Sequence, residues 1–205
     1  MKIKRFSDNL RNKSDKAELY SVTTDLLYQN YLLSFAGILI TAAVTTYLVY
    51  RNYGYSFFES PMIRFWFPVT FILLLLKLVI SLIYRHASSL YSIDERTWRH
   101  FYYILVSISG SAIGSSAYFT RVIVNPEHFL ILVMVVGTLS SASTAVLSPN
   151  LKALTLFNFF MLAPYLVQFL HGGKWSGVLI IIVWSYVIYT TSKIINRTLI
   201  QSLML

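Results

Sequence analysis

Residues 101–120 read FYYILVSISGSAIGSSAYFT, and residues 129–148 read FLILVMVVGTLSSASTAVLS. Both stretches are apolar along their whole length and carry glycine, serine and threonine at short intervals. In lipid, helices gain nothing from burying apolar surface against each other, so close approach at small residues and hydroxyl hydrogen bonds hold them together. The two stretches therefore predict membrane helices that pack against other helices.

Composition assigns the rest of the chain to the same class. Hydrophobic residues make up 56% of the 205 residues and charged residues 12%, whereas soluble domains carry about 25% charged residues. The net charge of +9 does not indicate a nucleic-acid partner, because the basic residues cluster at helix ends, as in membrane proteins. Cysteine is absent, which excludes disulfides and thiolate chemistry.

The predicted fold is an all-α, polytopic membrane helix bundle. Each apolar stretch is close to the roughly 20 residues that a helix needs to cross the hydrocarbon core, and none shows the alternation of a barrel strand. A basic arm with a possible interfacial helix occupies residues 1–27, and the six-span bundle follows over 28–195. We expect transmembrane helices at 31–50, 65–84, 101–120, 129–148, 153–171 and 177–195.

The distribution of lysine and arginine predicts the orientation of the bundle. An even number of spans places both termini on one side, which also collects most of the basic residues. The opposite side has only Arg51, Arg64, Arg121 and Lys174. Short loops rich in lysine and arginine stay in the cytoplasm. We therefore expect both termini to be cytoplasmic, in a protein of the bacterial inner membrane with no cleaved signal peptide.

Small residues spaced four apart mark candidate packing faces. Gly110 and Gly114 form a GxxxG pair, and Gly137 and Ser141 repeat the spacing on the next predicted helix. Such pairs let two helix backbones approach closely. Close packing inside the bundle is one interpretation of these residues, and a homodimer face is the other.

Three residues inside the predicted spans are candidates for ligand binding or switching: Lys77, Asn158 and Pro164. Lys77 is an ionisable residue within a span, and it either reaches the membrane interface with its long stem or faces the bundle interior, towards an anionic ligand, Asn158 or the serine rows. Pro164 removes a backbone hydrogen bond and is expected to bend its helix. A bent helix beside serine-rich helices could leave a cavity for a small ligand, or it could be static.

No catalytic site is predicted. Every carboxylate lies outside the six spans, and the histidines occur singly at span ends. The sequence contains no Gly-rich phosphate loop, no GxSxG and no HExxH. We expect neither an enzymatic activity in this segment nor a metal or cofactor.

The last stretch predicts a helix that continues beyond the membrane. After Tyr189 no glycine or proline ends the helix, and Ile195, Leu199 and Leu203 recur at helical spacing. Residues 196–205 are therefore expected to begin a cytoplasmic signalling helix, cut at a domain boundary. A short amphipathic tail is the alternative.

The order of these features resembles a known sensor module. The loop that closes on Asp94-Glu95-Arg96-Thr97-Trp98-Arg99, the Gly/Ser-rich span, the Gly-Thr-Leu-Ser-Ser-Ala run from Gly137 and Pro164 ahead of Gly172-Gly173 resemble the six-helix membrane domain of bacterial sensor histidine kinases and GGDEF-type diguanylate cyclases. The resemblance implies a homodimer whose last helix joins a cytoplasmic output domain. No phosphoacceptor histidine or GGDEF sequence occurs in this chain.

Two functions follow as hypotheses. The first is a sensory input domain that detects a small or lipophilic ligand, or a state of the lipid bilayer, and passes the signal through the last helix by a shift in populations. The second is a small stand-alone membrane transporter or scaffold. The low number of charges inside the membrane and the lack of similarity between residues 31–120 and 129–195 weigh against transport.

Overall fold

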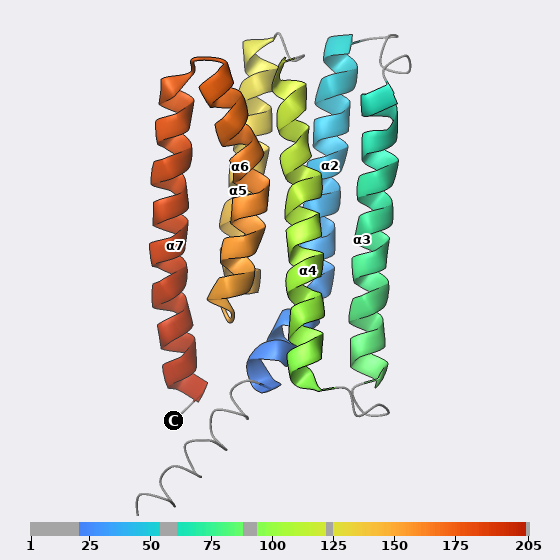
Figure 1. Ribbon diagram of the computed structural model, residues 1–205, viewed down its shortest axis with the longest axis vertical. Coiled ribbons are helices and arrows are strands. Elements are labelled where there is room, and N and C mark those ends of the chain that lie inside the picture. Colours follow the sequence, from blue (N-terminus) through green and yellow to red (C-terminus); the bar gives the residue numbers. More distant parts are fainter. Residues whose placement is uncertain (1–20, 54–60, 88–93, 122–124, 204–205) are drawn as a thin grey trace, which may run out of the picture.

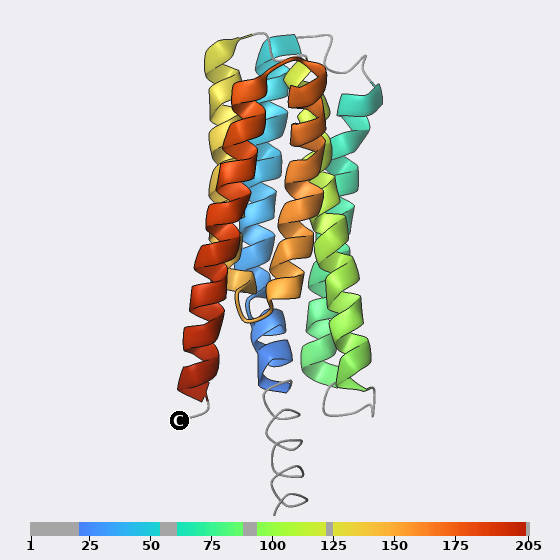
Figure 2. The ribbon, with the colours of Figure 1, turned by 60° about the vertical axis from the view of Figure 1, so that its left-hand side comes forward.

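The computed structural model describes residues 21–53, 61–87, 94–121 and 125–203, and these contain helices and no strand. After a helical segment at 21–29, the long helices run alternately up and down and lie side by side (Figures 1 and 2). Residues 21–29 and the end of the last helix lie at the same end of the bundle (Figure 1). The elements are α2 (Tyr31–Tyr53), α3 (Pro61–Ala87), α4 (Glu95–Gly114), the 3₁₀ helix η2 (Ser115–Arg121), α5 (Pro126–Leu147), α6 (Leu151–His171) and α7 (Trp175–Leu203).

Five helices of the described residues are long and apolar enough to cross a membrane, which indicates a multi-pass membrane protein. They are α2, α3, α5, α6 and α7, and they cover the predicted spans at 31–50, 65–84, 129–148, 153–171 and 177–195. Their ends differ from the prediction by a few residues, and α7 continues as one helix to Leu203. The helix ahead of the predicted cytoplasmic stalk is therefore unbroken.

The predicted span at 101–120 is not one apolar α-helix. The α-helix begins earlier, at Glu95, and ends at Gly114, after which the chain continues as η2. Charged residues at its start and serines along its length make α4 less apolar than the five other long helices. Helix α4 nevertheless belongs to the bundle, where it packs against α2, α3 and α6 (Figure 1).

Local sequence signals explain where several helices begin. The side chains of Asp94, Asn125 and Asn150 each accept a hydrogen bond from a backbone N–H in the first turn of α4, α5 and α6. These bonds satisfy donors that have no partner within a helix. The turn from α6 to α7 passes through Gly173, whose positive φ of 65° suits a residue without a Cβ.

Helices α4 and α6 approach each other through the GxxxG pair. A Cβ on Gly110 would lie 2.6 Å from the carbonyl oxygen of Phe157, and one on Gly114 would lie 2.9 Å from that of Met161 and closer still to that of Phe160. The two glycines therefore serve a contact within the chain. In lipid, such backbone contact is a main source of helix association.

The helix at 21–29 packs on the end of the bundle through aromatic side chains. Tyr28 is fully buried, stacks on Tyr84 of α3 with ring centroids 3.9 Å apart and donates a hydrogen bond to the backbone oxygen of Trp98 in α4. The guanidinium of Arg99 donates to the hydroxyl of Thr24 over 2.7 Å. A helix is thus present at 21–29, at the end of the predicted arm, and residues 1–20 lie outside the described residues.

Candidate functional site

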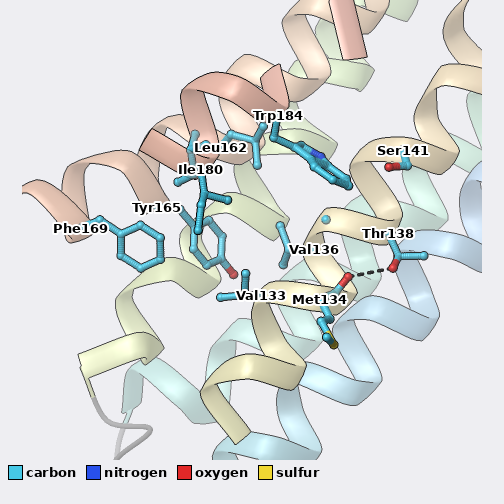
Figure 3. A pocket seen from close by; sticks show the side chains of 12 residues that line it. Val133, Met134, Val136, Thr138, Ser141, Leu162, Tyr165, Phe169, Ile180 and Trp184 are labelled. Atoms are coloured by element: carbon cyan, nitrogen blue, oxygen red, sulfur yellow. Dashed lines mark hydrogen bonds between the residues drawn. The ribbon is translucent and has the colours of Figure 1, made fainter. Parts of the chain in front are cut away.

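A cleft of about 550 Å³ lies between α5, α6 and α7, and we call it the α5–α6–α7 cleft. Side chains of all three helices surround one space (Figure 3). Its lining is Val133, Met134, Val136, Gly137, Thr138 and Ser141 from α5, Leu162, Tyr165 and Phe169 from α6, and Ile180, Ile181 and Trp184 from α7. Most of these groups are hydrocarbon or aromatic, which is typical of a site for a lipophilic molecule.

Small residues on α5 keep this cleft open. A Cβ on Gly137 would meet only the Cζ2 atom of Trp184, at an ordinary contact distance of 3.9 Å, and Ser141 is exposed on the same face. Tight helix packing was expected at both positions. Instead they line the cleft, with Trp184 of α7 the nearest side chain to Gly137.

Few polar groups reach the cleft, and none of its lining residues is charged. The hydroxyl of Thr138 donates to the backbone oxygen of Met134, and the hydroxyls of Tyr165 and Ser116 form a hydrogen bond of 2.6 Å. Within the described part of the chain, the Ser141 hydroxyl and the Trp184 indole N–H have no hydrogen-bond partner. The cleft therefore offers donors to an uncharged ligand, whereas a buried charge would be uncompensated there.

Asn158 forms a polar cluster that joins α5 to α6. Its Oδ1 accepts from Ser140 over 2.5 Å, and its Nδ2 donates to the Ser143 hydroxyl over 3.1 Å and to the backbone oxygen of Leu154. The amide thus uses both of its N–H donors and its oxygen. Asn158 is 8% exposed and does not line the α5–α6–α7 cleft, although it lines a second hollow between α6 and α7. Because its amide is already satisfied by α5 and α6, its hydrogen bonds favour a structural role.

Pro164 lies on α6 between two cleft residues, Leu162 and Tyr165. The helix is continuous through the proline. Proline cannot donate to the carbonyl four residues earlier, which here is Phe160. That same carbonyl faces Gly114 of α4. The proline therefore removes the usual helical donor from a carbonyl at the glycine contact, and it lies between the α4–α6 crossing and the wall of the cleft.

Lys77 lies in the interior of the bundle. It is 3% exposed, and its Nζ donates to the Ser34 hydroxyl of α2 over 2.7 Å. The side chain therefore does not reach the membrane interface. Among the described residues, no hydrogen bond joins it to Asn158 or to the serines of α4 and α5. Lys77 and the α5–α6–α7 cleft are separate features.

A single asparagine fixes the far end of α7. The Nδ2 of Asn196 donates to the backbone oxygens of Ser148, over 2.7 Å, and Pro149, over 3.1 Å, in the turn between α5 and α6. Ile195 is exposed and Leu199 half-buried around this bond, and α7 ends at Leu203. Otherwise α7 is the least buried of the five apolar helices, with 17% of its apolar stretch buried against 50% in α6.

The site has no group that indicates catalysis. No cluster of histidine and carboxylate side chains suited to a metal ion occurs among the described residues. Comparisons with known proteins suggest no activity for the site. The sequence matches no protein-family model, and neither a curated protein nor a solved structure is significantly similar to it.

Sequence reasoning missed the residues that matter most to the cleft. Trp184 and Ile181 belong to an apolar run in which every residue is equally suited to lipid contact, so nothing in the sequence singles them out. Asn196 carried a weak signal, since it is an amide in the polar part of a helix otherwise predicted to contact only solvent or a partner. Pro164 was the informative residue, because a bent helix beside serine-rich helices suggested a cavity, whereas Gly137 was predicted only as a close-packing residue.

Proposed function

We propose that the chain is a membrane-embedded sensory input domain in which a neutral lipophilic ligand enters the α5–α6–α7 cleft and changes the position of α7. The supporting observation is the cleft itself, which lies between α7, the least buried of the five apolar helices, and the two helices that α7 packs on. A ligand shifts an equilibrium only by its different affinity for the two states. A ligand held between Gly137 and Trp184 favours states in which α7 lies farther from α5.

The proposal extends to topology and output. The end of the bundle that carries residues 21–29 also carries Arg85, Arg96, Lys152, Lys193 and Arg197, whereas the other carries Arg51, Arg64 and Lys174. By the positive-inside rule the first end is cytoplasmic, in the inner membrane of a bacterium. Helix α7 would then join a cytoplasmic output domain, a histidine kinase or a diguanylate cyclase, and act within a homodimer.

Spin labels test the motion of α7 directly. The chain has no cysteine, so Ser111→Cys on α4 and Leu179→Cys on α7, both at exposed positions, provide two clean labelling sites at the end of the bundle away from the Asn196 hydrogen bonds, where a displacement of α7 is largest. Gly137→Phe fills the cleft and imitates an occupied state. We expect the label-to-label distance distribution from pulsed electron paramagnetic resonance in nanodiscs to change in Gly137→Phe. Ala43→Phe, which adds the same ring to the exposed face of α2, should leave it unchanged.

Ligand binding is tested with a photoreactive long-chain alkyl ketone, whose carbonyl can accept from Ser141 or Trp184. Label recovered on α5 and α7 at the cleft in the wild type, and lost in Gly137→Phe, supports the site. Equal labelling in both proteins contradicts it. The reading frame after Leu205 tests the output: a kinase or cyclase joined through a continuous helix supports signalling, and a stop codon contradicts it.

A further inference from the structure

A second hollow lies on the other side of the contact between α6 and α7, and we call it the α6–α7 groove. It measures about 460 Å³ and is lined by residues that include Phe159, Ala163 and Leu166 of α6 and Ile182 and Tyr189 of α7. Leu162 and Ile181 line both this groove and the α5–α6–α7 cleft. They form the wall between the two spaces.

The groove has the shape of a site for a hydrocarbon chain. On α6 its lining extends from Leu154 to Leu166, which at about 1.5 Å per residue is about 18 Å. One leaflet of the hydrocarbon core is about 15 Å thick, half of the roughly 30 Å of the whole core. No charged residue lines the groove. One acyl chain of a lipid in a single leaflet therefore matches its length and its chemistry.

Two lysines extend the groove at one end. Lys152 lies one helical turn before the lining residue Thr155, and Lys193 one turn after Tyr189, and residues three or four apart share a helix face. Because α6 and α7 are antiparallel, both lysines lie at the same end of the groove (Figure 1). Both are exposed, and the Lys152 Nζ lies 4.9 Å from the centroid of the Tyr103 ring.

The charge of these lysines is not balanced within their helices. No aspartate or glutamate follows Glu127 in the sequence, and no ion pair involves Lys152 or Lys193 within the described residues. Basic residues at the membrane surface attract anionic lipids. We propose that the α6–α7 groove binds an anionic phospholipid of the adjacent leaflet, with one acyl chain along the groove and the phosphate between Lys152 and Lys193.

The site does not depend on the function proposed above, and its test uses the purified chain. Nanodiscs containing equal amounts of phosphatidylglycerol and phosphatidylcholine are dissolved in mild detergent, and native mass spectrometry counts the lipids that stay bound. We expect the wild type to retain phosphatidylglycerol over phosphatidylcholine. Changing both Lys152→Gln and Lys193→Gln should weaken this preference by about fivefold per lysine. Lys174→Gln, at the opposite end of the bundle, is the matched control and should retain the preference.

A second variant tests the acyl chain. Ala163→Phe places a ring in the groove and should reduce retention of phosphatidylglycerol while both lysines remain. Circular dichroism checks the fold, and Ser185→Leu, at another groove residue, replaces Ala163→Phe if that variant does not fold. The proposal is overturned if the wild type retains both lipids equally, or if the double glutamine variant keeps the wild-type preference for phosphatidylglycerol. It is also overturned if Lys174→Gln loses as much of that preference as the double variant, or if the groove variant retains phosphatidylglycerol as well as the wild type does.

Discussion

Alanine at Gly110 provides the sharpest test of the α4–α6 contact. Its Cβ would lie 2.6 Å from the Phe157 carbonyl oxygen, and ordinary contact begins at 3.4 Å, so the helices must separate by about 0.8 Å. The obstructing atom belongs to the backbone and cannot rotate away. Overpacking of this kind lowers the free energy of unfolding by about 1–3 kcal/mol, and we expect a loss at the upper end of this range. The better helix propensity of alanine offsets about 1 kcal/mol of it. The net loss is therefore about 2 kcal/mol.

Gly137→Ala is the matched control, because its Cβ meets only Trp184 at 3.9 Å. The propensity gain of up to about 1 kcal/mol is then unopposed, so the two alanine variants should differ by about 3 kcal/mol, or about 100-fold in the unfolding equilibrium. Gly114→Ala should lose more stability than Gly110→Ala, because its Cβ would lie closer to a backbone carbonyl oxygen.

The assay is reversible unfolding in mixed micelles, with sodium dodecyl sulfate as denaturant and circular dichroism as the signal. Two protein concentrations tenfold apart separate the possible causes. A contact within one chain gives a loss that is independent of concentration, whereas a homodimer contact gives a loss that depends on it. Equal midpoints for Gly110→Ala and Gly137→Ala, or a concentration-dependent loss, would refute the role of the glycine pair inside the bundle.

Three further substitutions test the polar groups. Asn158→Leu should lose about 1 kcal/mol of stability in the same unfolding assay, because the hydroxyls of Ser140 and Ser143 lose their amide partner; an unchanged midpoint would show that the cluster does not hold α5 to α6. Lys77→Met should insert normally and unfold no earlier than the wild type, because a cation with one hydrogen bond is costly inside the membrane; a lower midpoint would contradict this. Asn196→Ala should broaden the distance distribution between spin labels attached through Thr97→Cys on α4 and Thr198→Cys on α7, both at exposed positions, because the end of α7 loses its bonds to the α5–α6 turn; an unchanged width would contradict the tether.

The apolar runs were sufficient to predict most of the bundle, because each membrane helix must carry its own hydrophobic length. The stretch at 101–120 was harder, since its serines support both helix packing and the change to a 3₁₀ helix at Ser115. The sequence also could not show how closely each glycine approaches a neighbouring helix. Gly110 and Gly137 look equivalent as small residues, but only Gly110 meets a backbone, because the choice of neighbour depends on how the helices are arranged around one another.

The partners of polar residues depend on that same arrangement. Lys77 and Asn158 were both expected to be of interest, and a contact between them was one possibility. The structure separates them, with Lys77 on Ser34 and Asn158 on Ser140, because α3 and α6 are not neighbours. The cleft was anticipated only in outline, from Pro164 beside serine-rich helices. The residues that α7 contributes to the cleft, Trp184 among them, belong to an apolar run in which nothing in the sequence distinguishes them from their neighbours.

The hydrogen bonds of Asn196 make α7 a lever with a fulcrum near its end. Trp184 lies twelve residues before Asn196 and Leu203 seven residues after it, so the two arms are about 18 Å and about 10 Å long at about 1.5 Å per residue. If α7 pivots rigidly at the tether, an outward step of about 2 Å at Trp184 gives a step of about 1 Å in the opposite direction at Leu203. The sense of motion is thereby inverted between the cleft and the far end of the helix.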